Sequence, residues 1–494
     1  MKRRTTPLDS PTIQRLLLAV LSAALSALLG ASHSLGAWIS GVPAMVAIRQ
    51  ASVRESLLCG LVAGGLCTAV TAWGLRHYSL FLYLAAVAII GGFVAVAAAM
   101  IAWLGRGRTS HWTWIFIPPL VWVPLASIRS LVDLPLSSNV AGSQADFPAI
   151  LQIAALTGPS GISFLLALGN AVIAQAMSFA FDARRGRPVA WRMWSGLGLT
   201  ALVFIGGAVL GGTYYLMRHP TNDQGIKVAV VQGGLPIEYY HRGAIDQTMK
   251  QLLRDRYAQL TQFAGTSKPE LVIWPEEPTL GDLLAGDRLD PAIVALAKKQ
   301  RAMLLIGSST SERGGPTSFE ARFNSALLIS DSGELLARYD KRRPTPFEPY
   351  RPGHRSPLLH TPAGLTGLLI CEESLYPSLP RDLVRQGAGV LMELSNDAGF
   401  SRSPLAVFHA HEAVLTAVTY HRPYVRAGQS GPSYLIDQLG RIQAESAPFE
   451  STVLVGLVSS SSRQTVALRW SEWFPVLCLG LSVGLALGTL QRRG

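Results

Sequence analysis

Eight long apolar segments constrain what this chain can fold into more than any other feature of its sequence. They lie at about 15–32, 35–48, 56–75, 79–104, 112–128, 150–180, 191–217 and 470–490. A helix of about 20 apolar residues spans the roughly 30 Å of hydrocarbon in a bilayer, and most of these segments are long enough. The sequence therefore predicts an integral membrane protein with about eight transmembrane helices. The second segment is short, so a re-entrant loop is an alternative there.

The basic residues predict which way these segments cross the membrane. Lys and Arg are enriched in short cytoplasmic loops. With a cytoplasmic N-terminus and a crossing at every segment, only Arg76, Arg129 and Arg218 lie near span ends on the outside. On the inside lie Lys2, Arg3, Arg4, Arg15, Arg49, Arg54, Arg106, Arg108, Arg184, Arg185, Arg187, Arg192, Arg492 and Arg493. We therefore expect the region between the seventh and eighth segments to be external.

Two other interpretations of these features are less favoured. Residues 15–32, with small residues at Ala31 and Ser32, also have the pattern of a cleavable signal peptide. We expect this segment to stay uncut because several spans follow it, and cleavage would leave the later topology unchanged. The net charge of +12 does not indicate a nucleic-acid partner. The basic residues flank apolar segments and form no stripe with interleaved aromatics, which suits anionic lipid head groups better.

From about 219 to 469 the sequence changes to a soluble α/β pattern. Apolar runs typical of strands alternate with stretches of helical periodicity, which indicates a sheet covered by helices. Strands are predicted at 226–232, 270–278, 303–307, 324–330, 334–343, 367–370, 389–394, 424–427 and 433–436, and helices at 244–263, 291–301 and 404–420. We expect an N-terminal bundle of about seven helices at 1–218, the α/β domain at 219–469 and a C-terminal transmembrane helix at 470–494.

Three of the predicted strands end at chemically reactive residues, which are Glu276, Lys341 and Cys371. A cysteine nucleophile must become a thiolate, and a nearby carboxylate can take its proton as a general base. A lysine can stabilise the oxyanion that forms next, and it also favours the thiolate. Taken singly, each residue has a structural alternative: a packed core cysteine, a capping acid and a solvated turn lysine. Their common position at strand ends favours the catalytic interpretation.

The remaining cysteines and histidines do not suggest a metal site. Cys371 is the one cysteine outside the long apolar runs, which contain Cys59, Cys67 and Cys478. No disulfide framework or zinc spacing can be built from these four residues. His409 and His411 are two positions apart and do not share a helix face. We therefore expect neither a metal nor another cofactor.

The order Glu, Lys and Cys on strand ends resembles the carbon–nitrogen hydrolase, or nitrilase, superfamily. A domain of that type outside the membrane, after about seven spans and before one more, resembles the apolipoprotein N-acyltransferase family. Further matching motifs are Leu151–Ala154, Leu156–Phe164 with Asn170, Val230–Gln232, Trp274–Glu276, Tyr339–Lys341, Pro346–Phe347, Ser395–Ala398, Arg422–Pro423, Arg426–Ala427 and Ile436–Asp437 with Gly440.

This resemblance implies a fold, a location and a reaction. The fold is an α-β-β-α sandwich on the periplasmic side of a multi-pass protein in the bacterial inner membrane. The reaction moves an acyl chain from a phospholipid, through a thioester on Cys371, to the N-terminal amine of diacylglyceryl-cysteine in an apolipoprotein. Glu276 is the implied base and Lys341 the implied oxyanion donor. The resemblance also implies a monomer that needs no cofactor.

The chain departs from the family pattern at several positions, and other functions stay open at this point. The departures are at Arg343, Glu348, Glu372, Gly399, Thr416 and Thr419. Glu348 and Glu373 are candidates for a supporting acid, with a solvated turn acid as the alternative for each. One other function is a membrane-tethered amidase or nitrilase that acts on a C–N bond with water as acceptor. A catalytically inactive scaffold is another.

Overall fold

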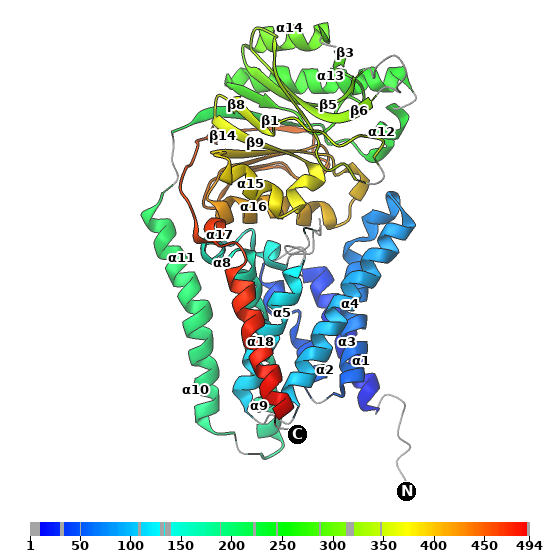
Figure 1. Cartoon of the computed structure of the whole chain (residues 1–494). Coiled ribbons are helices and arrows are strands. Elements are labelled where there is room, and N and C mark those ends of the chain that lie inside the picture. Colours follow the sequence, from blue (N-terminus) through cyan, green and yellow to red (C-terminus); the bar gives the residue numbers. More distant parts are fainter. Residues whose placement is uncertain are drawn as a thin grey trace.

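The computed structural model consists of a bundle of long helices with an α/β part stacked on one end of it (Figure 1). It describes residues 10–29, 34–49, 51–106, 110–128, 133, 140–187, 189–220, 224–243, 246–285, 288–312, 321–345 and 348–491. Several residues used above lie outside these ranges, namely Lys2, Arg3, Arg4, Ala31, Ser32, Arg108, Arg129, Pro346, Phe347, Arg492 and Arg493.

Six helices of the described chain are long and apolar enough to cross a membrane. They are α1 (Pro11–Leu29), α3 (Val53–Thr71), α4 (Leu80–Gly105), α9 (Pro159–Arg184), the helix that runs from α10 (Trp191–Thr200) through η5 (Ala201–Gly206) to α11 (Gly207–Arg218), and α18 (Trp473–Gln491). The predicted second segment forms η2 (Gly36–Trp38) and the short helix α2 (Val42–Ile48). The fifth forms α5 (His111–Ala126), which contains three prolines. The structure thus confirms a membrane bundle but does not confirm eight spans.

The prediction of one helical segment over 150–180 is wrong. The chain breaks at Gly158, whose φ of +67° is left-handed, and Pro159 then begins α9. Glycine enters this conformation without a Cβ clash, and proline at a first helical position lacks only an N–H that would be unsatisfied anyway. The residues before the break form two short helices, α7 (Pro148–Leu151) and α8 (Ala154–Thr157). Both pack under the α/β part instead of entering the bundle.

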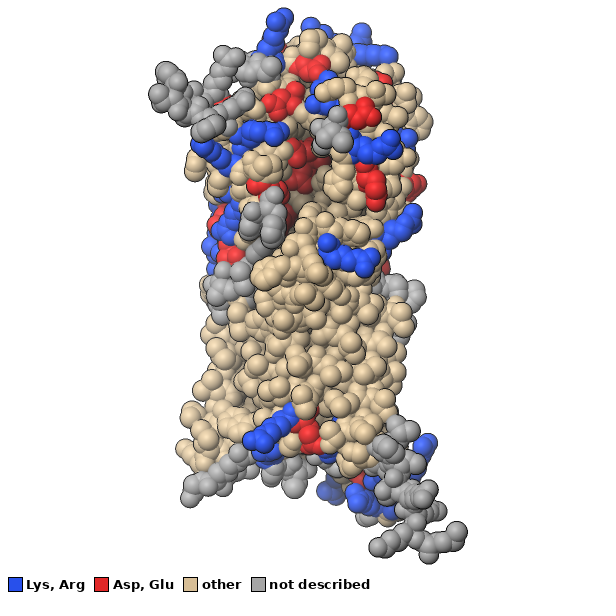
Figure 2. Space-filling model, turned by 90° about the vertical axis from the view of Figure 1, so that its right-hand side faces the viewer, with Lys and Arg blue, Asp and Glu red and all other residues tan. Residues whose placement is uncertain are grey.

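The surface of the bundle carries a broad band without charged side chains, with Lys, Arg, Asp and Glu above and below it (Figure 2). Large apolar side chains are exposed on this part of the chain, including Leu28, Leu84, Ile89, Leu202 and Leu487. A soluble protein rarely leaves so much contiguous apolar surface in water. The band therefore faces lipid, and the protein is a membrane protein.

The α/β part contains two six-stranded sheets, each with three parallel strands in its middle and antiparallel strands outside them. The first sheet has the order β14 (Thr452–Val458), β1 (Ile226–Gln232), β2 (Leu271–Ile273), β5 (Met303–Glu312), β6 (Ala321–Ile329) and β7 (Leu335–Asp340). The second has the order β13 (Ile442–Glu445), β12 (Tyr434–Ile436), β11 (Tyr424–Gly428), β10 (Val390–Ser395), β9 (Gly364–Ile370) and β8 (Leu358–Thr361). A small third pair joins β3 (Leu284–Ala285) to β4 (Arg288–Leu289).

Apolar side chains on the inner faces of the two sheets meet and form the core of a sandwich. Val230 and Ile273 come from the first sheet, and Leu368, Ile370 and Met392 from the second. On the outer faces, α13 (Gln247–Ala264) and α14 (Pro291–Gln300) cover the first sheet, while α15 (Ser378–Arg385) and α16 (Leu405–Tyr420) cover the second (Figure 1). The expected α-β-β-α fold is confirmed.

The sandwich packs on α7, α8 and the neighbouring end of the bundle through apolar side chains. Val414, Ala417 and Val418 of α16 pack in one cluster with Ile150 and Leu151 of α7. Beside them, the Gln152 side-chain amide donates to the carbonyl of Leu439 at 2.9 Å. These contacts hold the sandwich against the end of the bundle.

The sequence predicted most strands and helices of the sandwich, and the structure differs in some boundaries and in elements that were not predicted. The strand before Glu276 is shorter than predicted, since β2 ends at Ile273. The helix predicted over 244–263 is α13, and a separate short helix, α12 (Ile237–Gly243), precedes it. The strands β8, β13 and β14 were not predicted. All three are outer strands of their sheets.

Candidate active site

Three strand ends bring Glu276, Lys341 and Cys371 to one edge of the sandwich. Lys341 directly follows β7 and Cys371 directly follows β9, while Glu276 lies in the turn after β2. Lys341 Nζ is 3.2 Å from Glu276 Oε1, and Cys371 lines the same cavity as Glu276. The Glu276 carboxylate and the Lys341 ammonium belong to the first sheet, whereas the thiol belongs to the second. The site is therefore assembled by the packing of the two sheets.

Glu276 is buried and held in place through both carboxylate oxygens. The Asn324 side-chain amide donates to Oε1 at 2.7 Å, and the backbone N–H of Asn396 donates to Oε2 at 3.0 Å. Burial raises the pKa of Glu276 above its ordinary value, while the positive charge of Lys341 opposes that shift. A carboxylate with a raised pKa is a stronger base than one in water. Sequence reasoning missed the role of Asn324, which lies on a predicted strand but carries no local signal.

Lys341 is fully buried, and it stays charged because carboxylates surround it. Burial alone would lower the pKa of Lys341, but the negative charges of Glu276 and Glu348 raise it well above its ordinary value. Its ammonium group donates to Glu348 Oε1 at 2.8 Å. Glu348, one candidate for a supporting acid, thus contacts Lys341. Its own part in a reaction stays a prediction.

Glu373, the other candidate, is fully buried and binds backbone groups instead. Its carboxylate accepts hydrogen bonds from the Tyr339 hydroxyl at 2.8 Å, the Arg342 N–H at 2.8 Å and the Ile370 N–H at 2.9 Å. These donors come from the ends of β7 and β9. Glu373 therefore ties the strand that carries Lys341 to the strand that carries Cys371.

Cys371 has a backbone conformation that is unusual for a residue with a side chain. Its φ is +51°, in the left-handed region, where a non-glycine residue costs about 1–3 kcal/mol unless surrounding contacts impose it. Burial raises the pKa of the Cys371 thiol well above its ordinary value, the charge of Glu276 adds to this, and Lys341 opposes it. The resting thiol is therefore protonated, and it needs a neighbouring base in order to react.

One large cavity, of about 1110 Å³, joins this site to the interior of the bundle. Its upper wall includes Glu276, Cys371 and Asn396, and its lower wall is formed mainly by small and apolar residues of the bundle. On α3 and α4 these include Gly60, Ala63, Gly64, Cys67, Leu82, Ala86, Ile90 and Val94. Figure 2 shows a hollow with acidic side chains just above the uncharged band. No local pattern in the sequence indicates this cavity, because it depends on tertiary packing.

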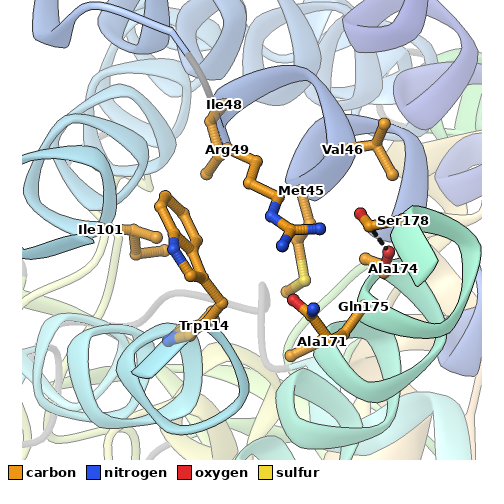
Figure 3. Close-up of a pocket in the computed structure, with 11 residues that line it drawn as sticks. Met45, Val46, Ile48, Arg49, Ile101, Trp114, Ala171, Ala174, Gln175 and Ser178 are labelled. Carbon is orange, nitrogen blue, oxygen red and sulfur yellow. Dashed lines mark hydrogen bonds between the residues drawn. The ribbon is translucent and has the colours of Figure 1, made fainter. Parts of the chain in front are cut away.

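A second pocket lies within the bundle and is too small for an organic substrate. Arg49, Trp114 and Gln175 point into it (Figure 3), and its volume is about 20 Å³. That volume holds about one water molecule.

His409 is engaged in hydrogen bonds and is not free to bind a metal. Its Nδ1 lies 2.8 Å from Asp397 Oδ1 and its Nε2 lies 3.0 Å from the Ser374 hydroxyl. Arg426 also binds Asp397, at 2.7 Å. Within the described ranges, no group of three or more His, Cys, Asp or Glu residues is placed to hold a metal ion.

The fold and the strand-end residues define the class of this protein, and comparison with known proteins supports that assignment. Residues 227–467 match the family model for the carbon-nitrogen hydrolase domain. Residues 17–172, in the bundle, match the model for the apolipoprotein N-acyltransferase N-terminal domain. The α/β part is thus a carbon–nitrogen hydrolase domain carried on a membrane bundle.

Relatives that share both parts narrow the class to a family. An apolipoprotein N-acyltransferase of Geobacter metallireducens is 27% identical over 97% of this chain and 95% of its own length. One from a Nostoc species is 26% identical over 82% of this chain and 81% of its own length. The chain belongs to the apolipoprotein N-acyltransferase family, and it is an acyltransferase.

Proposed function

We propose that the protein transfers an acyl chain from a phospholipid to the N-terminal amine of diacylglyceryl-cysteine in apolipoproteins, through a thioester on Cys371. The observation that carries this proposal is the continuous cavity from Cys371 into the bundle. In this cavity the acyl chains of a phospholipid can lie among apolar helices while the ester group reaches the Cys371 thiol. At about 1110 Å³ the cavity exceeds the roughly 300–1,000 Å³ of ordinary small-molecule sites.

In the first half of the reaction, Glu276 takes the proton of the Cys371 thiol. The thiolate attacks the ester carbonyl, and the ammonium of Lys341 stabilises the oxyanion that develops. When the intermediate collapses, the C–O bond breaks and Glu276 returns its proton to the departing lysophospholipid. The acyl chain is left as a thioester on Cys371.

In the second half, the acceptor amine attacks the thioester carbonyl. Its C–N bond forms as the C–S bond breaks, and the thiolate of Cys371 leaves next to Lys341. The surplus proton of the new amide returns to the sulfur through Glu276, which restores the starting state. Because one chain supplies all three residues, we also propose that it acts as a monomer.

The amidase alternative is not favoured. A small amide needs no opening toward apolar helices, and the relatives that share both parts of this chain are named as N-acyltransferases. An amidase would use water as the second acceptor.

A large side chain introduced on the part of α4 that lines the cavity should block long acyl chains only. Ala86 lines the cavity, whereas Ala88, two positions along the same helix, is exposed on the outside of the bundle. Ala86→Phe should reduce transfer from a long-chain phospholipid by on the order of tenfold or more, because the ring takes space from the chain and each CH₂ kept out of the cavity loses about 0.8 kcal/mol. Transfer from a donor with short acyl chains should be nearly unchanged.

The measurement is the rate of N-acylation of a lipopeptide, with Ala88→Phe as the matched control. If Ala86→Phe slowed short and long donors equally, or if Ala88→Phe behaved in the same way, the cavity would not be the path of the acyl chain.

We further propose that the protein lies in the bacterial inner membrane with the domain at 219–469 in the periplasm, between a bundle at 1–218 and a last helix at 470–494. The arginine asymmetry supports this orientation. In a variant without its native cysteines, a cysteine at Ser462 should react with a membrane-impermeant maleimide added to spheroplasts. A cysteine at Arg187 should react only after lysis. Labelling of both sites before lysis would exclude this topology.

A further inference from the structure

Four carboxylates of the described chain line the cavity near Cys371, and three of them are bound to other side chains. Glu276 and Glu348 both accept from Lys341, at 3.2 and 2.8 Å. Glu277 accepts from the Tyr350 hydroxyl. Each of these three carboxylates therefore already has a side-chain hydrogen-bond donor within the site.

The fourth, Glu372, is the residue directly after the nucleophile. It lies in η7 (Cys371–Leu375), lines the cavity and is partly exposed to it. Among the residues that the structure describes, it has no hydrogen-bond or ion-pair partner. The charged groups that face it are Lys341, Glu348, His409 and Glu276. Burial and the two neighbouring carboxylates raise its pKa, while Lys341 and His409 oppose the shift.

Lys341 donates to Glu276 and Glu348 and makes no hydrogen bond or ion pair with Glu372. A partly buried carboxylate without a cation gains from binding one, since charge-assisted hydrogen bonds are roughly twice as strong as neutral ones. The proposed reaction supplies one cation to this place, the α-ammonium of the acceptor. An ammonium cannot attack a thioester until it has lost a proton.

We propose that Glu372 is a further catalytic residue, which binds the α-ammonium of the acceptor and takes the proton that makes it a nucleophile. The inference rests on the function proposed above. The ammonium gives one proton to the Glu372 carboxylate and becomes an amine. The amine nitrogen then attacks the carbonyl carbon of the Cys371 thioester and the C–S bond breaks. The second surplus proton of the nitrogen passes through Glu276 to the sulfur, and Glu372 releases its own proton to water after the product leaves.

Glu276 is less suited to this task in the second half-reaction. Both of its oxygens are held, by Lys341 and Asn324 on one side and by the Asn396 N–H on the other. It is placed to exchange a proton with the sulfur. Glu276 therefore exchanges a proton with the thiol, and Glu372 takes a proton from the acceptor ammonium.

The test separates the two half-reactions by using Glu372→Gln, which keeps the shape of the side chain and removes its charge. Purified full-length protein is loaded from phospholipid, and the thioester is then discharged with a diacylglyceryl lipopeptide in single-turnover experiments. The transfer rate constant, divided by the loading rate constant, should fall by about tenfold to a hundredfold, as expected for loss of a hydrogen bond to a charged group. Glu372→Asp should recover part of the loss.

Hydroxylamine provides the control nucleophile, because it is uncharged at neutral pH and needs no site for an ammonium. It should discharge the thioester of wild type and of Glu372→Gln at the same rate. The defect with the lipopeptide should also shrink as the pH rises toward the α-amino pKa of about 7.7–8.0, because more acceptor is then already deprotonated. Glu334→Gln, at an exposed turn between β6 and β7, is the matched variant that should change nothing.

The outcomes distinguish this inference from the function on which it rests. If no thioester formed in wild type, the proposed function would fail first. If the thioester formed, and Glu372→Gln passed it to the lipopeptide as fast as wild type at every pH, Glu372 would have no part in receiving the amine. An equal loss with hydroxylamine and lipopeptide would make Glu372 a structural residue, which also contradicts the inference.

Discussion

Replacing Cys371 by alanine should reduce acyl transfer by at least about 10³-fold, because removal of a covalent nucleophile leaves only binding and orientation. Alanine fits the space of the cysteine and takes away only the sulfur, so the fold should be retained. The measurement is the formation of N-acylated lipopeptide from phospholipid, followed by mass spectrometry. Cys371→Ser should also lose most of its activity, since a hydroxyl is far harder to ionise than a thiol.

Cys67→Ala is the matched control for this experiment. Cys67 lines the same cavity within the bundle, so its thiol is exposed to the same donor. Its replacement should leave the rate nearly unchanged. Near-normal transfer by Cys371→Ala would remove Cys371 from the mechanism.

Replacing Lys341 by methionine should slow thioester formation by on the order of 10²-fold or more, the loss that follows removal of one oxyanion donor. Methionine keeps most of the side-chain volume and removes the charge. The measurement is the rate of loading of Cys371 in single-turnover experiments. Lys298→Met, at an exposed position of α14, is the control and should load normally.

Stability has to be measured in the same experiment. Glu276 and Glu348 lose their cation in Lys341→Met, and breaking a buried ion pair on one side costs about 3–5 kcal/mol. The double variant Lys341→Met/Glu348→Gln removes one of the two unpaired carboxylates, and it should recover stability without recovering the loading rate. Full-rate loading by Lys341→Met would reduce this lysine to a structural role.

The sequence located the strand ends of the candidate site because each one carries a local signal. The strands predicted at 334–343 and 367–370 correspond to β7 and β9, which end directly before Lys341 and Cys371. Lys341 and Glu276 meet in the structure because the ends of β7 and β2 lie at one edge of the first sheet. The catalytic roles of these residues remain predictions.

Other parts of the site depend on contacts between distant segments, which local patterns do not report. The sequence left Glu373 as either a supporting acid or a solvated turn acid, and its partners in the structure lie at the ends of strands from both sheets. The cavity is invisible for the same reason, because it lies between the packed faces of α3 and α4 and the mouth of the sandwich.

The break near 158 is a different kind of miss, since the signal was present in the sequence. Gly158 and Pro159 interrupt an otherwise continuous apolar run, and such a pair is typical of a helix boundary. The prediction treated the residues before and after this pair as one segment because both are hydrophobic. In the structure the residues before this pair pack under the sandwich, and those after it form α9.

The most direct test of the account is to trap the acyl group on the enzyme. Purified protein incubated with phospholipid and no acceptor should gain the mass of one acyl chain on the tryptic peptide that contains Cys371, and neutral hydroxylamine should remove it. Adding a diacylglyceryl lipopeptide should transfer that same chain to its amine. Acylation of another residue, or transfer to the lipopeptide without any adduct on Cys371, would contradict the account.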